Sequence, residues 1–213
     1  MDKKYELIIF DLDGTLLDTS QGIFNSVRYA EKQMGLLPVA DSLLEQFVGP
    51  PPKQMYMKYY ELDESMALKA AQKHREYGRT KAVYEAAMYP NMENTLDTLK
   101  KNGYKLAVAT LKSQDIAEVI LENFNLKKYF NVILGMDAEE KLTKSMIINK
   151  AINKCKCKGK TVMIGDSKND FIGACEAKVD FIGVTYGFGY NESQSADYQF
   201  SIAKTPEEIL NFV

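Results

Sequence analysis

Two short apolar runs of the sequence are each followed by a pair of acidic residues. Asp11 and Asp13 come directly after the run YELIIF, and Asp166 and Asp170 come after the run TVMI. Runs of this kind are typical of strands that are buried on both faces of a parallel sheet. Because ligand sites in such sheets lie beyond the carboxyl ends of the strands, we expect the four carboxylates to gather at one edge.

Carboxylates held close together repel one another and therefore need a cation. Hard oxygen ligands in a partly open site suit Mg²⁺, which prefers few protein ligands together with water and phosphate. Thr110 follows a third apolar run, YKLAVA, and Lys141 and Lys144 stand close to the start of a predicted helix. A hydroxyl and a lysine at this edge would bind the anion that Mg²⁺ also neutralises. The sequence therefore predicts a site for Mg²⁺ and a phosphate group.

Composition narrows the possible chemistry and partners. The 213 residues include one histidine, His74, and three cysteines without a CxxC pair. A single histidine excludes zinc sites that need two or three. Carboxylates, lysines, tyrosines, thiolates and His74 remain as general bases, and we expect the carboxylates to carry the chemistry of an enzyme. Sparse, unpaired cysteines indicate reduced thiols. The net charge of −2 provides no positive field for nucleic acid or an anionic membrane, so we expect neither as a partner.

The N-terminal residues do not form a signal peptide, because their apolar run is short and stops at Asp11. No run of 18 apolar residues occurs, so we expect no membrane span. These features predict a cytoplasmic protein. Whether it is a monomer or a homodimer is left open by the sequence.

Strand and helix patterns alternate after Pro90. The predicted strands are residues 104–109, 131–134, 161–164, 181–184 and 198–200. The predicted helices are residues 92–102, 113–124, 143–155 and 169–177, followed by a last helix with Thr205 as its cap. Such alternation indicates a parallel sheet with right-handed crossovers, hence an α/β fold.

The stretch between the first strand and Pro90 reads as helical instead. Apolar residues recur at helical spacing from Ile23 to Met34, with Thr19 or Ser20 as cap and Gly35 as stop. We also expect a capping box at residues 42–45, and a long helix from Asp63 to about Tyr84. The segment is thus predicted to be a helical domain, residues 18–86, inserted into an α/β core domain formed by residues 1–17 and 87–213.

Four short motifs agree in order and spacing with one known superfamily. DLDGTLLDT matches the pattern DxDGT, Thr110 matches a Thr or Ser at a strand end, Lys144 matches a lysine, and GDSKND matches GDxxxD. The chain therefore resembles the haloacid dehalogenase superfamily over nearly its whole length, and within it the phosphoglycolate-phosphatase-like proteins most. The resemblance implies a Rossmann-like parallel-sheet core with an inserted all-helical cap domain.

The resemblance also implies roles for the aspartates. Asp11 would attack phosphorus and form an aspartyl phosphate, and Asp13 would protonate the leaving oxygen and then activate water. Mg²⁺ would bind the Asp11 carboxylate, the Asp13 backbone carbonyl and Asp166, while Asp170 would bind the metal or orient its waters. The implied activity is Mg²⁺-dependent hydrolysis of small phosphate monoesters, with phosphoglycolate or a nucleoside monophosphate as candidate substrates.

Phosphate binding is implied for three further residues. Thr110 and the amide of Leu111 would hold phosphate oxygens, and Lys144 would neutralise the phosphate and Asp11. Lys141 is the alternative to Lys144, and Lys112 either touches substrate or is solvated.

Alternatives remain at the level of specificity and of function. Lys53, Arg75 and Arg79 in the helical segment either reach a second anionic group of the substrate or form a solvated helix face, and His74 is interpreted as structural. A phosphomutase acting on a sugar phosphate and a non-catalytic regulatory protein on the same fold are the alternative functions. A dehalogenase is disfavoured because Asp13 is present. The links at residues 16–18 and 86–90 are candidate hinges.

Overall fold

The computed structural model describes residues 4–191 and 199–213. Six strands form one parallel sheet in the order β5-β4-β1-β6-β7-β8. Their bounds are Leu7–Phe10 (β1), Lys105–Ser113 (β4), Val132–Met136 (β5), Thr161–Gly165 (β6), Asp180–Val184 (β7) and Ser201–Ala203 (β8). The predicted α/β class and parallel sheet are confirmed. The chain order reverses between β1 and β6, which places a crevice beyond the carboxyl ends of these two central strands.

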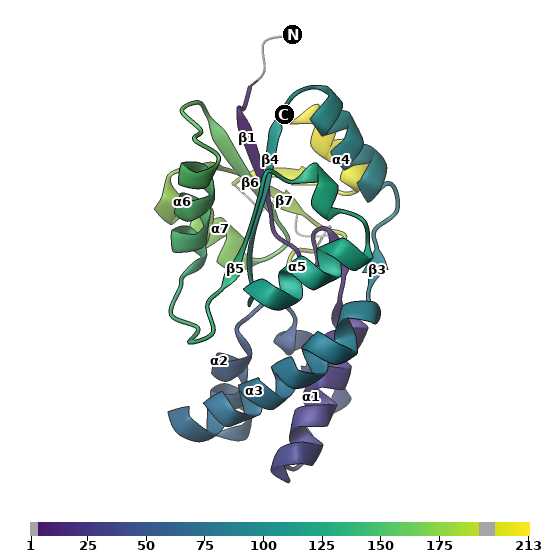
Figure 1. The fold of residues 1–213 in the computed structure, drawn as a ribbon, viewed down its shortest axis with the longest axis vertical. Coiled ribbons are helices and arrows are strands. Elements are labelled where there is room, and N and C mark those ends of the chain that lie inside the picture. The colour runs from purple at the N-terminus through teal and green to yellow at the C-terminus, as the bar shows by residue number, and fades with distance from the viewer. Residues whose placement is uncertain (1–3, 192–198) are drawn as a thin grey trace.

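Helices cover both faces of the sheet (Figure 1). Helices α6 (Lys144–Lys154) and α7 (Lys168–Ala177) pack on one face, while α4 (Met92–Lys101), α5 (Gln114–Asn123) and the 3₁₀ helices η3 (Lys127–Tyr129) and η5 (Pro206–Asn211) lie on the other. Alternate residues of β1 serve the two faces: Ile8 and Phe10 join the cluster under α4 and α5, and Leu7 and Ile9 join the cluster under α6. Strands buried on both faces explain why the sequence runs are continuously apolar.

A helical segment lies between the short strands β2 (Leu17–Asp18) and β3 (Ala87–Met88), which pair antiparallel. It contains α1 (Ser20–Met34), η1 (Asp41–Phe47), α2 (Pro52–Tyr60), α3 (Glu64–Thr80) and η2 (Ala82–Tyr84). These helices have a buried apolar cluster of their own, centred on residues such as Val27, Phe47 and Tyr56. Figure 1 shows the segment at the end of the sheet opposite the two chain termini, where the strands have their carboxyl ends. The residues between the first two strands of the large sheet are therefore mainly helical, as predicted.

Two local predictions in this segment were wrong, and one feature beside it was not predicted. The capping box at residues 42–45 is absent: residues 41–47 form a 3₁₀ helix preceded by Ala40, with no side-chain cap bond. Leu44 and Phe47 of this helix are buried in the segment's own cluster, so packing sets its conformation. The third helix ends at Thr80 rather than near Tyr84, because the chain turns at Lys81 and buries Val83 against the sheet. The strand pair β2–β3 was not expected.

Two differences occur near the C-terminus. The predicted strand at residues 198–200 begins outside the described residues, and the observed strand β8 starts only at Ser201. The last helix follows Thr205 as predicted but is a 3₁₀ helix without a threonine cap bond. Glu208 accepts a hydrogen bond at 2.7 Å from the amide of Lys204, the residue before the cap, so the predicted capping box is not formed.

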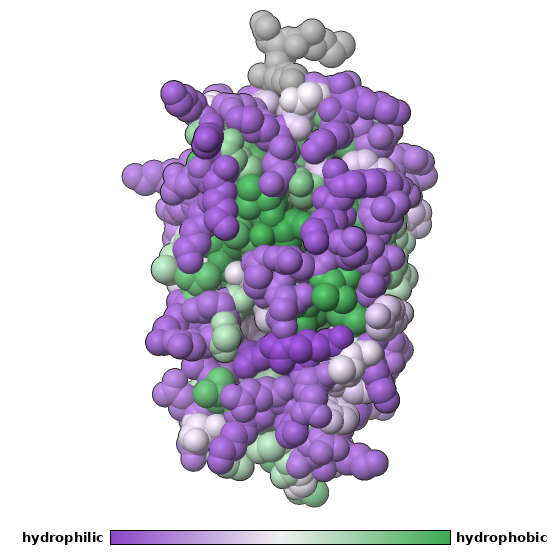
Figure 2. All heavy atoms as spheres, in the orientation of Figure 1, coloured by the Kyte–Doolittle hydropathy of each residue, from purple (hydrophilic) through white to green (hydrophobic). Residues whose placement is uncertain are grey.

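The surface seen in Figure 2 is mostly hydrophilic. Apolar side chains gather on this face mainly beside the edge strand β5, between α5 and α6 (Figures 1 and 2). Leu134, Leu142 and Ile147 line a hollow there. Within residues 4–191 and 199–213, no helix combines the length and apolar character needed to cross a bilayer.

Candidate active site

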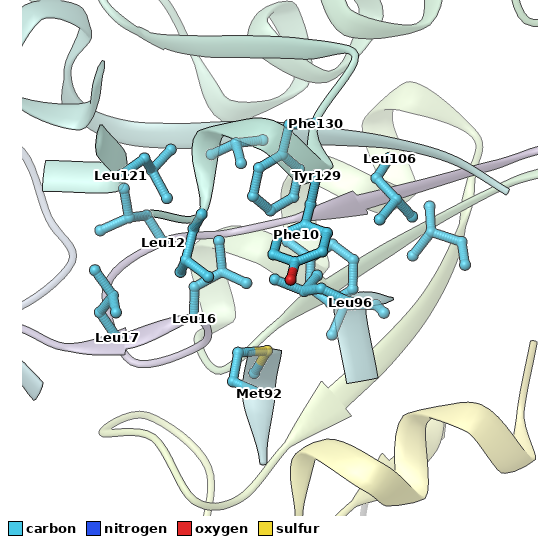
Figure 3. Close-up of a cluster of buried hydrophobic side chains, with 14 of the residues drawn as sticks. Phe10, Leu12, Leu16, Leu17, Met92, Leu96, Leu106, Leu121, Tyr129 and Phe130 are labelled. Carbon is cyan, nitrogen blue, oxygen red and sulfur yellow. The ribbon is translucent and has the colours of Figure 1, made fainter. Parts of the chain in front are cut away.

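The loop that follows β1 is held by its apolar residues, and its acidic residues face the carboxyl edge of the sheet. Leu12, Leu16 and Leu17 are fully buried and pack around Phe10 beneath α4 and α5 (Figure 3). Asp11, between two of these anchors, donates its amide to the Ile164 carbonyl of β6 at 2.9 Å. In DLDGTLL, the leucines therefore anchor the loop in the core, and the aspartates next to them keep their carboxylates at the sheet edge.

Glycine is required in this loop at position 14. Gly14 has a φ of +76°, and a Cβ atom there would lie 2.2 Å from Asp166 Oδ2. A side chain would therefore be strained by its backbone conformation and would collide with a carboxylate. Gly14 allows the β1 loop and the β6 loop to approach each other.

Three aspartates form a buried cluster at this edge. One carboxylate oxygen from each of Asp11, Asp166 and Asp170 lies within 4.8 Å of the others, and each residue is at most 5% exposed. Lys144 reaches the cluster from the first turn of α6, and its Nζ lies 2.6 Å from Asp11 Oδ1 and 2.6 Å from Asp170 Oδ1. The one ammonium thus contacts two of the three carboxylates, and no described cation pairs with Asp166.

Burial and mutual repulsion shift the titration of this cluster. Burial raises the pKa of Asp11 to about 7, with the Lys144 ammonium opposing this rise and Asp170 and Asp13 adding to it. Burial, followed by the charges of Asp170 and Asp11, raises the pKa of Asp166 well above its usual range. Burial alone would lower the pKa of Lys144, but the Asp11 and Asp170 carboxylates raise it above its ordinary value. The protein alone therefore does not stabilise all three carboxylates in their charged form.

Asp170 gives the clearest indication of the kind of ligand that this cluster would bind. Its Oδ2 accepts hydrogen bonds from the amide of Ser167 at 3.0 Å and from the Ser167 hydroxyl at 2.6 Å, as part of the capping box of α7. Its Oδ1 is buried and, although close to Lys144, is not aligned for a hydrogen bond with any described group. The contact with Lys144 at 2.6 Å is an ion pair. A buried oxygen in this state suits a hard divalent cation such as Mg²⁺.

Asp166 is positioned by the loop after β7. The amide of Phe188 donates to Asp166 Oδ2 at 2.8 Å. A Cβ atom on Gly187 would lie 2.2 Å from the Gly14 carbonyl, and one on Gly189 would lie 2.4 Å from the Asp166 carbonyl. Backbone approach this close explains why the loop alternates glycine with aromatic residues, and it fixes the direction of the Asp166 carboxylate.

Asp13 has a different environment from the cluster. Its Oδ1 accepts a hydrogen bond from the Thr19 hydroxyl at 2.5 Å and lies 2.8 Å from Lys112 Nζ. Lys112 is only 13% exposed in its side chain, so it is not a solvated lysine. Thr19 was expected to cap α1, but its side chain makes no cap bond and binds Asp13 instead.

The structure places Thr110 and Leu111 close to the end of β4. Phe10 pairs with Val108, so Thr110 lies just beyond the point where β1 ends. Thr110 is buried, and its hydroxyl accepts the Lys112 amide at 3.2 Å. The pairing of β4 with β5 shifts register between Ala109 and Ser113. Residues 110–112 therefore follow an irregular path at the same edge as the aspartates.

The two candidate lysines have different surroundings. Lys144 is buried in contact with Asp11 and Asp170. Lys141 is 74% exposed in its side chain and pairs with Glu139. The structure therefore brings Lys144, rather than Lys141, to the aspartate cluster.

The three cations singled out in the helical segment are each paired with a carboxylate. Lys53 Nζ lies 3.1 Å from Glu64, Arg75 binds Glu140 and Arg79 binds Asp115. His74 is buried and shares a hydrogen bond of 3.4 Å with the Tyr56 hydroxyl. Burial, and then the nearby Lys112 and Arg75 charges, lower the pKa of His74 to about 3, so it is neutral.

Two cavities meet at Asp13 and separate the helical segment from the sheet. One is lined by residues that include Ile23, Phe47, Arg75, Lys112 and Glu140. The other is lined by residues that include Glu45, Asp166, Ser167, Lys168 and Phe188. Asp13 is thus accessible from two sides, one beside Lys112 and one beside Asp166.

Sequence reasoning did not find several neighbours of the site. The roles of Phe188 and Glu140 depend on contacts between distant segments. Thr19 lies within the quoted motif DLDGTLLDT, but its contact with Asp13 was not predicted. Ser167 precedes Asp170 by three residues, which is a capping-box spacing and could have been recognised.

Comparison with known proteins assigns a family to this arrangement. Residues 8–184 match the haloacid dehalogenase-like hydrolase family. A 5'-nucleotidase of Pseudomonas aeruginosa is 34% identical, covering 91% of this chain and 88% of its own length. A phosphoglycolate phosphatase of Agrobacterium fabrum is 35% identical, covering 85% of this chain and 81% of its own length. The crystal structure of a predicted phosphatase from Clostridium acetobutylicum superposes with a TM-score of 0.90 at 36% identity, over 99% of this chain and 98% of that one. The chain therefore belongs to the haloacid dehalogenase-like hydrolases, and it is an enzyme of their phosphatase type.

Proposed function

We propose that this chain hydrolyses small phosphate monoesters in a Mg²⁺-dependent reaction that passes through a phosphorylated Asp11. The observation that carries the proposal is the buried cluster of Asp11, Asp166 and Asp170 with Lys144 as its only described cation in direct contact. Such a cluster combines a nucleophilic carboxylate, ligands for a hard cation and an ammonium that can neutralise a phosphate.

Asp11, Asp166 and the backbone carbonyl of Asp13 would hold Mg²⁺, with Asp170 as a ligand or as a partner of its waters. The buried Oδ1 of Asp170, which has an ion-pair contact but no hydrogen bond, and the raised pKa values of Asp11 and Asp166 support this assignment. When bound, Mg²⁺ would neutralise negative charge on the cluster and on the phosphate oxygens.

In the first step, a carboxylate oxygen of Asp11 attacks phosphorus, and the bond between phosphorus and the leaving oxygen breaks. Asp13 donates a proton to that leaving oxygen. In the second step, Asp13 takes a proton from a water molecule whose oxygen attacks phosphorus, so that inorganic phosphate leaves and the Asp11 carboxylate is restored. The separation of roles is supported by the surroundings, because Asp13 faces Thr19 and Lys112 while Asp11 faces Lys144.

Phosphate oxygens are held by the Thr110 hydroxyl, the Leu111 amide and Lys144. Their common location at the carboxyl edge of the sheet supports this role. Lys144 bridges Asp11 and Asp170, so it orients the nucleophile before the phosphate arrives.

We further propose that residues 18–86 form a cap domain over a core domain formed by residues 1–17 and 87–213. The separate apolar cluster of the helical segment supports this division. The paired strands β2 and β3 are the only described connections between the two parts along the chain, and they are the candidate hinge. Closing the cap would exclude bulk water from the phosphorylated aspartate.

The three cysteines are free thiols, which supports a cytoplasmic location. The partner of the enzyme would be its small-molecule phosphate ester. A phosphomutase is the second candidate function, and transfer of phosphate to a sugar hydroxyl without phosphate release would identify it. A non-catalytic regulatory role would need a missing catalytic residue, and each motif residue is present.

The test is release of inorganic phosphate from p-nitrophenyl phosphate with Mg²⁺. We expect the Asp11→Asn variant to lose activity by at least about 10³-fold, because an amide is a poor nucleophile and cannot replace the carboxylate. Asp97→Asn is the matched control, since Asp97 is a surface aspartate of α4 that pairs with Lys101. Full activity of Asp11→Asn, or of the wild type in excess chelator, would contradict the proposal.

A further inference from the structure

The cavity on the Lys112 side of Asp13 combines apolar walls with four charged side chains. Ile23 and Phe47 of the helical segment and Met136 of β5 supply apolar lining. Asp13, Lys112, Arg75 and Glu140 supply the charges. Because Asp13 is the proposed proton donor to the leaving group, this cavity is where part of the leaving group would lie.

Arg75 and Glu140 connect the two parts of the molecule across this cavity. Arg75 lies on α3, whereas Glu140 lies in the loop between β5 and α6. Their side chains form an ion pair and are only 7% and 2% exposed. A pair this well buried is screened little by solvent, so the guanidinium charge is neutralised within the protein.

Glu140 has a second partner that fixes its carboxylate in the cavity. Its Oε2 accepts a hydrogen bond from the Lys53 amide at 3.3 Å, in the first turn of α2. The backbone of Glu140 has a φ of +53°, a conformation that is costly for a residue with a side chain. Two partners from two helices and an unfavourable backbone angle show that the loop is built to hold this carboxylate in place.

The other charges of the cavity are paired as well. Lys112 is paired with Asp13, and His74 in the cavity wall is neutral. Among the described residues that line the cavity, each cation therefore already faces a carboxylate. If the substrate carries a second negative group in addition to its phosphate, no described cation in this cavity is free to pair with it.

The cavity on the Asp166 side offers no better place for a second anion. Its lining includes Asp13, Glu45 and Asp166 against Lys168 as the one described lysine. Asp166 is a proposed metal ligand, but Asp13 and Glu45 would repel an anionic leaving group there.

We infer that this enzyme selects phosphate monoesters whose leaving group carries no negative charge, and that Glu140 enforces this selection by occupying Arg75. The inference rests on the proposed function and names its substrate class. A carboxylate on the leaving group, as in phosphoglycolate, would have to displace Glu140 from Arg75 or lie unpaired beside Glu140 and Asp13. Like charges brought together at a desolvated site are strongly unfavourable.

A pair of substrates that differ only in this charge tests the inference. The substrates are 2-phosphoglycolate and 2-hydroxyethyl phosphate, in which a CH₂OH group replaces the carboxylate. For the wild type we expect kcat/KM for 2-hydroxyethyl phosphate to exceed that for 2-phosphoglycolate by about tenfold or more, as expected for a like-charge penalty. The wild-type comparison needs no variant, so it decides the matter even if a variant fails to fold.

The Glu140→Gln variant tests the role of Glu140 itself. Because it leaves Arg75 without a counter-charge, we expect the preference for the uncharged substrate to fall by about tenfold or more. Glu139→Gln is the matched control: this neighbour is exposed and pairs with Lys141, so its removal leaves the preference unchanged. The inference would be overturned if the wild type preferred 2-hydroxyethyl phosphate over 2-phosphoglycolate by less than about tenfold in kcat/KM. It would also be overturned if a folded Glu140→Gln variant kept the wild-type preference. If the wild type hydrolyses neither of these two substrates nor p-nitrophenyl phosphate, the proposed function itself is refuted.

Discussion

Two regions of this protein bury carboxylates, and they do so in opposite ways. In the helical segment, Glu31 is 2% exposed and is surrounded by donors: Arg28 at 2.8 Å, the Tyr60 hydroxyl at 2.5 Å and the Val39 amide at 2.9 Å. At the sheet edge, Asp11 and Asp170 share Lys144, and no described cation pairs with Asp166 beside them. The protein provides enough hydrogen-bond donors for the Glu31 carboxylate, but too few for the carboxylates of the sheet-edge cluster.

The difference separates a structural carboxylate from a functional one. A buried charge that is fully paired with donors holds elements together, and for Glu31 these are α1, α2 and the chain before η1. A buried group of charges with too few donors destabilises the folded protein unless something else binds it. We infer that the sheet-edge cluster serves to bind a cation.

The largest expected contrast is in the response to Mg²⁺. We expect Asp166→Asn to lower Mg²⁺-dependent turnover by at least about 10²-fold, because it removes a proposed ligand of the ion. In the wild type, Mg²⁺ at 100 times its dissociation constant would stabilise the fold by about 2.7 kcal/mol. Thermal unfolding with and without Mg²⁺ measures this effect, which Asp166→Asn should lose and Glu31→Gln should keep. Equal stabilisation of the wild type and Asp166→Asn would remove the distinction between the two regions.

Glu31→Gln is expected to affect stability rather than chemistry. Replacing the carboxylate weakens its charge-assisted hydrogen bonds with Arg28 and Tyr60, at a cost of about 1–3 kcal/mol. Urea denaturation measures the change in the free energy of unfolding. A loss of kcat without a loss of stability would show that Glu31 belongs to the catalytic machinery after all.

Gly187→Ala tests how tightly the sheet-edge cluster is packed. The added Cβ would lie 2.2 Å from the Gly14 carbonyl, so the Phe188 loop must move away from Asp166, at a cost of about 1–3 kcal/mol. We expect a lower affinity for Mg²⁺, measured by titration calorimetry. Gly35→Ala is the control in the helical segment, since a Cβ there meets no atom within 4 Å and disturbs only the backbone. An unchanged Mg²⁺ affinity in Gly187→Ala would show that the loop does not position Asp166.

The smallest expected effect concerns the N-terminal cap of α3. The Asp63 carboxylate accepts the Met66 amide at 2.8 Å, and Asp63→Ala should destabilise the protein by about 1 kcal/mol. Because Asp63 lines neither cavity beside Asp13, kcat should not change. A large loss of kcat would instead show that α3 moves during the reaction.

The proposed catalytic residues could be located from the sequence because they lie within short motifs. The run DLDGTLL carries its own strand end, turn glycine and core anchors, so Asp11 and Asp13 could be placed without a structure. The sequence also predicted the helix that starts with Lys144, because Thr143 caps it and accepts the Met146 amide. It left the choice between Lys144 and Lys141 open. Strand and helix alternation likewise predicted the parallel sheet.

Other features could not be predicted because they depend on contacts between distant segments. Glu140 meets Arg75 across 65 positions of sequence, and nothing local marks either partner. The pairing of β2 with β3 joins two-residue strands, which are too short to show a pattern. Residues 41–47 and 206–211 became 3₁₀ helices because buried residues such as Phe47 and Ile209 fix them by packing.

Trapping of the phosphorylated enzyme tests the central claim most directly. The Asp13→Asn variant lacks the base that activates water, so mixing it with Mg²⁺ and p-nitrophenyl phosphate and quenching with acid should leave a phosphoryl group on the protein. We expect mass spectrometry of the peptides to locate that group on Asp11. The phosphoryl group should be absent in the double variant Asp11→Asn with Asp13→Asn. A phosphoryl group on any other residue, or turnover that leaves Asp11 unmodified in quenched Asp13→Asn, would contradict the account.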